Sequence, residues 1–118
     1  MIKVAIVVLA DTESHGDLGR LVNALEAVKE LKEAGDDVQL IFDGAGTKWI
    51  GELSKPDHKA KGLYEAVKDR VTGACRFRAG AFGATESVKS GAISLLGEYE
   101  GHPSLKKLIS QGYHVITF

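Results

Sequence analysis

The sequence predicts an α/β fold: a three-layer α/β/α sandwich with a mostly parallel sheet of about five strands, in one domain over residues 1–118. Apolar segments rich in valine and isoleucine alternate along the chain with segments of helical periodicity. No repeat, low-complexity tract or linker marks a second domain. With 118 residues, the chain can also bury a hydrophobic core without disulfides or a structural metal.

The first part of the chain predicts a strand, a helix and a second strand. Ile2–Ala10 is a nearly continuous apolar run, typical of a strand covered on both faces, and we expect it to lie centrally. Asp17 can cap a helix that runs to about Ala34, because leucine and valine recur on one face and Gly35 follows. Asp37–Phe42 is the second strand, expected to be parallel to the first through a right-handed crossover.

The rest of the chain continues the alternation, with glycine and proline marking the ends of several elements. The segment 91–96 fits either a strand or the end of the preceding helix. In order, we expect helices over 48–53 and 62–70, a strand over 71–75, a helix over 81–89, the segment 91–96, a helix from about residue 103 or 104 to 111, and a strand over 113–118.

The only cysteine, Cys75, lies where the third predicted strand gives way to a helix. Free backbone N–H groups and the positive end of a helix dipole favour a thiolate there, and Arg76 and Arg78 add positive charge. This pattern predicts a reactive centre at Cys75, Arg76 and Arg78, with an accessible thiol of lowered pKa. The alternative is a small apolar residue packed under the sheet, as most free cysteines are.

Ligands of parallel α/β sheets bind beyond the carboxyl ends of the strands, and several predicted loops meet there. The glycine-rich loop Asp43–Thr47 can cradle a phosphate, but it lacks the GxGxxG spacing and a Walker lysine, so a tight turn is favoured. His58 would serve as a general base only if its loop folds over Cys75. The candidate ligand-binding residues are Asp11, His15, Gly44, Gly46, His58 and His102.

Composition excludes several classes of function. The net charge is −1 and basic residues are scattered among acidic ones, so we expect no nucleic-acid partner and no membrane surface. No histidine pair has helical ligand spacing and one cysteine cannot form a Cys-based zinc site, so we expect no metal, and we expect no cofactor. A single cysteine cannot form an internal disulfide, and the apolar N-terminal run is too short to span a bilayer, so the expected location is cytoplasmic.

The order of these elements resembles the DsrE/DsrF-like proteins, which have the YchN-type fold with a flavodoxin-like layout. The resemblance covers nearly the whole chain and is carried by the strand Lys3–Val8, the helix through Leu31, the strand Val38–Phe42, Cys75 after the third strand, and the closing segment Leu105–Phe118. It implies a small sulfur carrier, in which Cys75 accepts sulfane sulfur as a persulfide and passes it to a partner thiol. The implied partners are sulfur donor and acceptor proteins and further copies of the chain, as a trimer or hexamer.

This chain departs from some relatives of that family because it has no second cysteine, so any transfer must go to an external thiol. Two other classes of function stay open. One is a non-catalytic small-ligand-binding or regulatory module that uses the cleft at the carboxyl edge of the sheet. The other is a small hydrolase with His15 or His58 as base and Asp11 or Glu13 as its partner, although no GxSxG motif is present.

The second half of the chain also holds more apolar residues than its short elements need for one small core. The surplus predicts burial between subunits. The residues concerned are Phe77, Phe82, Ile93, Leu95, Leu96 and Tyr99.

Overall fold

The computed structural model describes residues 1–118 and contains a five-stranded sheet flanked by helices. All neighbouring strands are parallel, in the order β4-β3-β2-β1-β5, which confirms the predicted α/β class. The strands are β1 (Lys3–Val8), β2 (Asp37–Phe42), β3 (Val71–Cys75), β4 (Leu95–Leu96) and β5 (His114–Thr117). The helices are α1 (His15–Glu33), α2 (Trp49–Leu53), α3 (Lys61–Val67), α4 (Arg76–Ala81), α5 (Thr85–Ser90) and α6 (Leu105–Ser110), with 3₁₀ turns η1 (Gly44–Lys48) and η2 (Lys68–Arg70).

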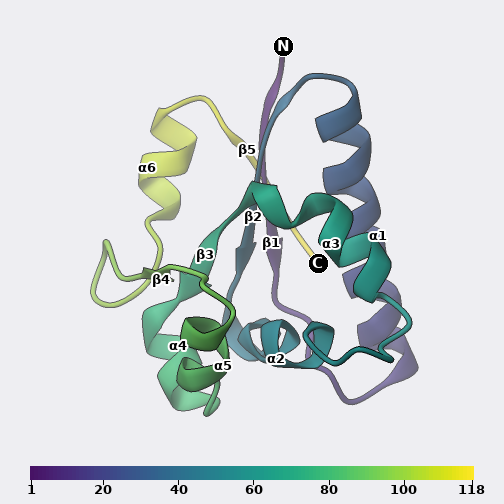
Figure 1. Ribbon diagram of the computed structural model, residues 1–118. Helices are drawn as coiled ribbons and strands as arrows, with labels where there is room; N and C mark the ends of the chain where they lie inside the picture. Colours follow the sequence, from purple (N-terminus) through teal and green to yellow (C-terminus); the bar gives the residue numbers. More distant parts are fainter.

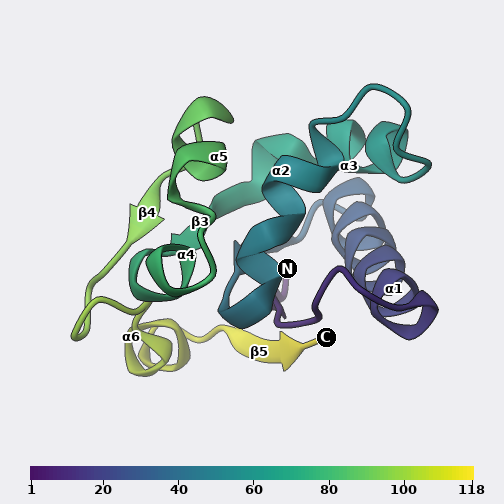
Figure 2. The same ribbon diagram turned by 90° about the horizontal axis from the view of Figure 1, so that it is seen from below.

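Helices cover both faces of the sheet unequally. Figure 1 shows α1 and α3 on one side of the strands and α6 on the other, while α2, α4 and α5 gather at the carboxyl ends. The same separation is visible from below in Figure 2. The larger core lies under α1, where Ile6 of β1 packs with Leu21 and Leu25, and the smaller one joins Val7 to Leu108 of α6. Burial of both faces of β1 follows from its continuous apolar run.

The strand β1 lies in the interior of the sheet, between β2 and β5, and β2 occupies the middle position. The predicted cap of α1, Asp17, lies three residues after the cap found, Ser14, and the helix begins at His15. Ser14 caps the helix by accepting a hydrogen bond from the Asp17 N–H at 3.1 Å, and the Asp17 carboxylate accepts one from the Ser14 N–H at 3.2 Å. This reciprocal pair is a capping box, in which Asp17 is the third helical residue. At the other end, Gly35 takes a left-handed φ of +81° just after the last turn.

The predicted single helix over 81–89 is wrong, because two short helices, α4 and α5, take its place. Gly83, at φ +70°, separates them, and Ala92, at φ +58°, ends the segment after α5. Of the ambiguous segment 91–96, two residues form β4, which pairs in parallel with the end of β3. The first of the two short helices, α4, begins at Arg76, directly after the last residue of β3.

The closing elements follow the prediction closely. Ser104 caps α6 by accepting a hydrogen bond from the Lys107 N–H at 3.1 Å, and β5 then pairs with β1 from Val4↔His114 onward. The protein contains no helix of sufficient length and apolar character to span a membrane.

Candidate functional site

Cys75 is both the last residue of β3 and the N-cap of α4. Its Sγ accepts a hydrogen bond from the Arg78 N–H at 3.5 Å, and the side chain is fully buried. The sequence correctly placed this cysteine at the carboxyl edge of the sheet, at a strand-to-helix junction. Its burial agrees with the alternative of a packed cysteine and not with the predicted accessible thiol.

A tight turn over residues 99–102 covers the Cys75 sulfur. Tyr99 and His102 exchange two backbone hydrogen bonds, of 2.9 and 2.8 Å, across Glu100 and Gly101. Both central residues have positive φ, +50° and +87°, the pattern of a type I′ turn. The Phe77 N–H of α4 donates to the Gly101 carbonyl at 2.9 Å, and this bond fixes the turn against the start of the helix.

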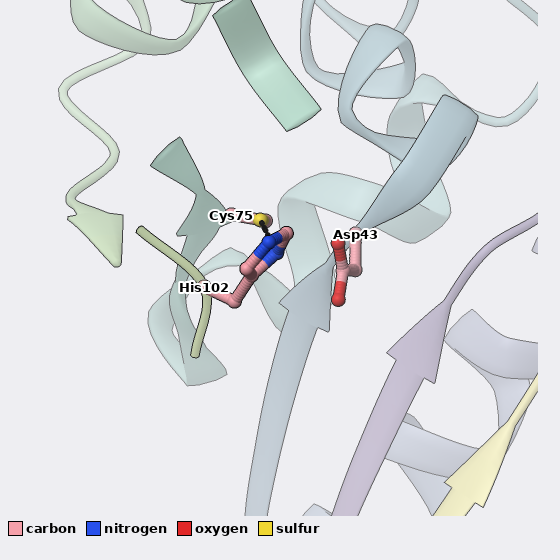
Figure 3. A group of neighbouring side chains, drawn as sticks. All are labelled: Asp43, Cys75 and His102. Atoms are coloured by element: carbon pink, nitrogen blue, oxygen red, sulfur yellow. Dashed lines mark hydrogen bonds between the residues drawn. The ribbon is translucent and has the colours of Figure 1, made fainter. Parts of the chain in front are cut away.

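The turn brings two hydrogen-bond acceptors to the sulfur. The Cys75 Sγ lies 3.3 Å from His102 Nδ1, a contact drawn in Figure 3. It also lies 3.7 Å from the Gly101 carbonyl oxygen. A thiol carries one proton and can donate it to one of these two acceptors at a time. When His102 carries its own proton on Nε2, Nδ1 can accept the thiol proton, which leaves a thiolate beside an imidazolium. The Phe77 ring, 5.0 Å from the imidazole between centroids, packs against His102.

Asp43 completes the group from the neighbouring strand. It follows the last residue of β2, which lies next to β3, and it accepts the Gly44 N–H at 2.6 Å as the cap of η1. A carboxylate oxygen of Asp43, the Cys75 Sγ and a ring nitrogen of His102 all lie within 4.8 Å of one another (Figure 3). We refer to Asp43, Cys75 and His102 as the edge cluster.

The sequence analysis assigned Cys75 and His102 to a site but not Asp43. The signal was present, because Asp43 and Cys75 both stand at the carboxyl ends of apolar strands that could be neighbours. What the sequence did not show was the order of the strands. That order places β2 and β3 side by side and so brings the carboxylate to the sulfur.

The electrostatic surroundings of Cys75 oppose the predicted thiolate. Burial is the largest influence on the Cys75 thiol and raises its pKa. The Arg78 N–H lowers this pKa, the Asp43 carboxylate raises it and the Phe77 N–H lowers it slightly, so the net shift is upward. The prediction of an exposed thiol with a lowered pKa is therefore wrong. At neutral pH the sulfur carries its proton and depends on a neighbouring base to lose it.

The two arginines face other neighbours. The Arg76 guanidinium lies against Gly97, where an added Cβ would come within 2.6 Å of Arg76 Cζ, and this contact helps to hold the segment after β4. Arg78 lies over the Phe77 ring, with 5.4 Å between Cζ and the ring centroid. Neither guanidinium is among the groups that shift the pKa of Cys75.

Apart from the two glycines, three of the candidate ligand-binding residues lie outside the edge cluster: Asp11, His15 and His58. Asp11 pairs with Lys48 at 2.5 Å, and this hydrogen-bonded ion pair holds the pKa of Asp11 below its ordinary value. His15 and His58 line a separate hollow of about 250 Å³ together with Trp49. The Nδ1 of His58 accepts the Ala60 N–H at 3.1 Å, so His102, and not His58, is the histidine at the sulfur.

Backbone geometry accounts for the two candidate glycines. Gly44 begins η1 with a φ of +54°, a conformation that residues with a Cβ rarely adopt. Gly46 packs directly on the end of β1, and a Cβ there would overlap the carbonyl group of Val8. Both glycines thus serve the tight turn that positions Asp43, the alternative that the sequence favoured over phosphate binding.

A hollow of about 490 Å³ adjoins the edge cluster on the outer side of the turn. Residues 99 and 102–106 line it, so His102 belongs both to the hollow and to the cluster. A molecule in this hollow would approach the imidazole before the sulfur.

No family model matches the chain. The chain is 35% identical over 96 residues to the uncharacterized protein MJ0733 of Methanocaldococcus jannaschii, an alignment that covers 81% of this chain and 78% of that protein. The structure is similar to that of BT1422, a conserved protein of unknown function from Bacteroides thetaiotaomicron, with a TM-score of 0.63, 16% identity, and coverage of 97% of this chain and 94% of that one. The similarity to BT1422 shows a shared fold. Because of its sequence identity to MJ0733 over most of both chains, the chain belongs to the same family as MJ0733.

Proposed function

We propose that this protein is a small sulfur carrier, in which Cys75 accepts sulfane sulfur as a persulfide and passes it to a thiol on a partner protein. The observation that carries the proposal is the 3.3 Å contact between the only cysteine sulfur and His102 Nδ1 at the carboxyl edge of a parallel sheet. The resemblance of the element order to DsrE/DsrF-like proteins supports it. A free thiol is kept reduced in the cytoplasm, where we place the protein.

The chemistry needs a thiolate, a persulfide donor and an acceptor thiol. His102 Nδ1 takes the Cys75 proton, and the thiolate attacks the outer sulfur of a donor persulfide. The donor S–S bond breaks, a new bond forms at Cys75 Sγ, and the donor leaves as a thiolate that takes up the proton. An acceptor thiolate then attacks the outer sulfur on Cys75 and restores the Cys75 thiolate, with no net oxidation. With no second cysteine in the chain, the acceptor is external.

The burial of Cys75 adds a requirement for access. The turn over residues 99–102 covers the sulfur, so a donor reaches Sγ when this turn moves away from α4. The turn is anchored there by the Phe77–Gly101 hydrogen bond, and its Tyr99 side chain is 64% exposed.

Intact-mass measurement tests the carrier proposal. The reduced protein, incubated with a small persulfide or polysulfide in chelator-treated buffer, is expected to gain one sulfur that a reductant removes. Cys75→Ser and Cys75→Ala are expected to gain none, because each lacks the nucleophile. Two variants are used because the serine hydroxyl would be buried, and circular dichroism checks that each is folded. A wild-type protein that takes up no sulfur from a donor that loads an unrelated reactive thiol would contradict the proposal.

A second candidate is a non-catalytic module that binds a small ligand. The fully buried sulfur and the hollow of about 490 Å³ next to His102 favour it. In that case Cys75→Ser would bind the ligand as well as the wild type does, and the mass measurement would show no loading.

We also propose that the protein forms a homo-oligomer, a trimer or hexamer, through an apolar surface formed by Phe77 and Tyr99. These side chains are 53% and 64% exposed, and their segments touch where Gly101 packs on Phe77. Phe82 is also exposed, at 41%. The other apolar residues assigned to the surplus, Ile93, Leu95 and Leu96, are partly buried against the two cores and so offer less exposed surface to a partner subunit.

Light scattering tests the oligomer. Tyr99→Glu is expected to shift the mass toward the monomer, because a charge in an apolar interface is costly to desolvate. Ile2→Glu, at a side chain that is 51% exposed near the chain start, serves as the matched control and is expected to keep the wild-type mass. A wild-type protein that stays monomeric at high concentration would contradict the proposal.

A further inference from the structure

We propose that the edge cluster, Asp43, Cys75 and His102, binds a soft divalent transition-metal ion such as Zn²⁺. The cluster offers one oxygen, one sulfur and one nitrogen donor, all within 4.8 Å of one another. Zinc binds thiolate sulfur at about 2.3 Å and imidazole or carboxylate atoms at about 2.0 to 2.2 Å, so a tetrahedral site holds its donor atoms about 3.3 to 3.7 Å apart. The 3.3 Å between Cys75 Sγ and His102 Nδ1 is within about 0.3 Å of the separation that a zinc-bound sulfur and nitrogen adopt, and the carboxylate would move by up to about 1.5 Å to join them.

The three donors are positioned by separate parts of the backbone. Asp43 is held at the end of β2, where one carboxylate oxygen accepts the Gly44 N–H and the other is left for a metal. Cys75 is held by β3, and its sulfur also accepts a hydrogen bond from the Arg78 N–H at the start of α4. His102 is held by the turn and by the Phe77 ring. A site formed by adjacent strand ends and a hydrogen-bonded turn needs little ordering when a metal binds.

The kind of metal follows from the donor set. Thiolate and imidazole ligands suit zinc and similar ions, whereas magnesium and calcium prefer oxygen ligands alone. Three protein ligands leave a fourth position open, as in exchangeable or catalytic zinc sites rather than closed structural ones. Histidine spacing along one helix and the number of cysteines predict no metal, but neither quantity bears on a mixed site whose ligands come from three segments.

The metal proposal shares Cys75 and His102 with the proposed function but does not rest on it. Metal binding is measured without any sulfur donor, and sulfur loading is measured in the presence of a chelator, so either can fail alone. If both hold, a bound ion occupies the Cys75 lone pairs and is expected to slow sulfur loading, because the sulfur is then a poorer nucleophile.

The first test is a cobalt titration of the reduced, chelator-treated protein. One Co²⁺ per chain is expected to bind and to give a near-ultraviolet thiolate-to-cobalt charge-transfer band, which Zn²⁺ then removes by displacement. Cys75→Ala is expected to lack the band. Because the band reports a sulfur ligand directly, the wild-type spectrum decides whether Cys75 ligates. A wild-type spectrum without this band, at excess Co²⁺, would overturn the proposal.

The second test measures zinc affinity by competition with a chromogenic chelator. Asp43→Asn and His102→Gln are each expected to weaken Zn²⁺ binding at least about tenfold. Asparagine retains an oxygen that can accept the Gly44 N–H, so the Asp43 variant removes the charge and not the cap. Asp57→Asn and His114→Gln, at exposed positions, are the matched controls and are expected to bind as the wild type does. Folded variants of Asp43 and His102 with unchanged affinity would overturn the assignment.

Discussion

Replacing Gly46 with alanine is expected to destabilise the protein by about 3 kcal/mol, at the upper end of the usual cost of overpacking. The added Cβ would overlap the Val8 carbonyl and lie 2.8 Å from its carbon, so β1 or η1 must shift. Neither is a flexible side chain that can move aside. In a domain of this size the loss corresponds to a fall in melting temperature of roughly 10 °C, which thermal denaturation followed by circular dichroism would detect.

Gly19→Ala provides the matched control for that substitution. Gly19 lies inside α1 with no atom within 4 Å of an added Cβ, so alanine there is expected to stabilise the protein by about 0.5 to 1 kcal/mol. If both alanine variants melted like the wild type, the close approach of η1 to β1 would be contradicted. Because Asp43 caps η1, the Gly46 variant should also displace the carboxylate from the edge cluster.

Replacing His102 with glutamine is expected to slow alkylation of Cys75 by iodoacetamide about 100-fold at neutral pH. The thiol pKa is raised by burial and by Asp43, so the sulfur is protonated at neutral pH and needs the imidazole to take its proton. Glutamine fills similar space and cannot act as a base. The measurement is the second-order rate constant across a pH series, in chelator-treated buffer.

The pH profile distinguishes proton transfer from simple access. Above the raised pKa of the thiol, solvent removes the proton in both proteins, so the two rates are expected to converge as the pH rises. His114→Gln, on the exposed edge strand β5, should follow the wild type. A ratio of rates that stays constant at every pH would show that His102 acts on the position of the turn and not as a base.

The fold was largely predictable because its signals are local. The apolar run of β1, the periodic face of α1 and the glycine after it, and the alternating end of the chain each specify their own element. The break between α4 and α5 was missed, although Gly80 and Gly83 weaken a continuous helix over this segment. Helices this short depend on packing with the rest of the molecule more than on their own sequence.

The candidate site was less predictable because its contacts are long-range. The position of Cys75 followed from the strand pattern, but its burial depends on a turn that lies more than twenty residues further along the chain. The pairing of Glu100 and Gly101 in that turn resembles the Asn-Gly and Asp-Gly pairs of type I′ turns, and it could have suggested a hairpin. Nothing in the local sequence indicated that its carbonyl would meet the sulfur.

The position of β5 bears on how the chain folds during synthesis. One edge of β1 pairs with β2, but the other pairs with β5, and the Phe118 carbonyl accepts hydrogen bonds from the N–H groups of Leu9 and Ala10. β1 is therefore translated well before β5, the strand that completes its pairing. Until residues 114–118 emerge, the edge of β1 that pairs with β5 has no partner strand. The sheet is therefore completed only after translation of this segment.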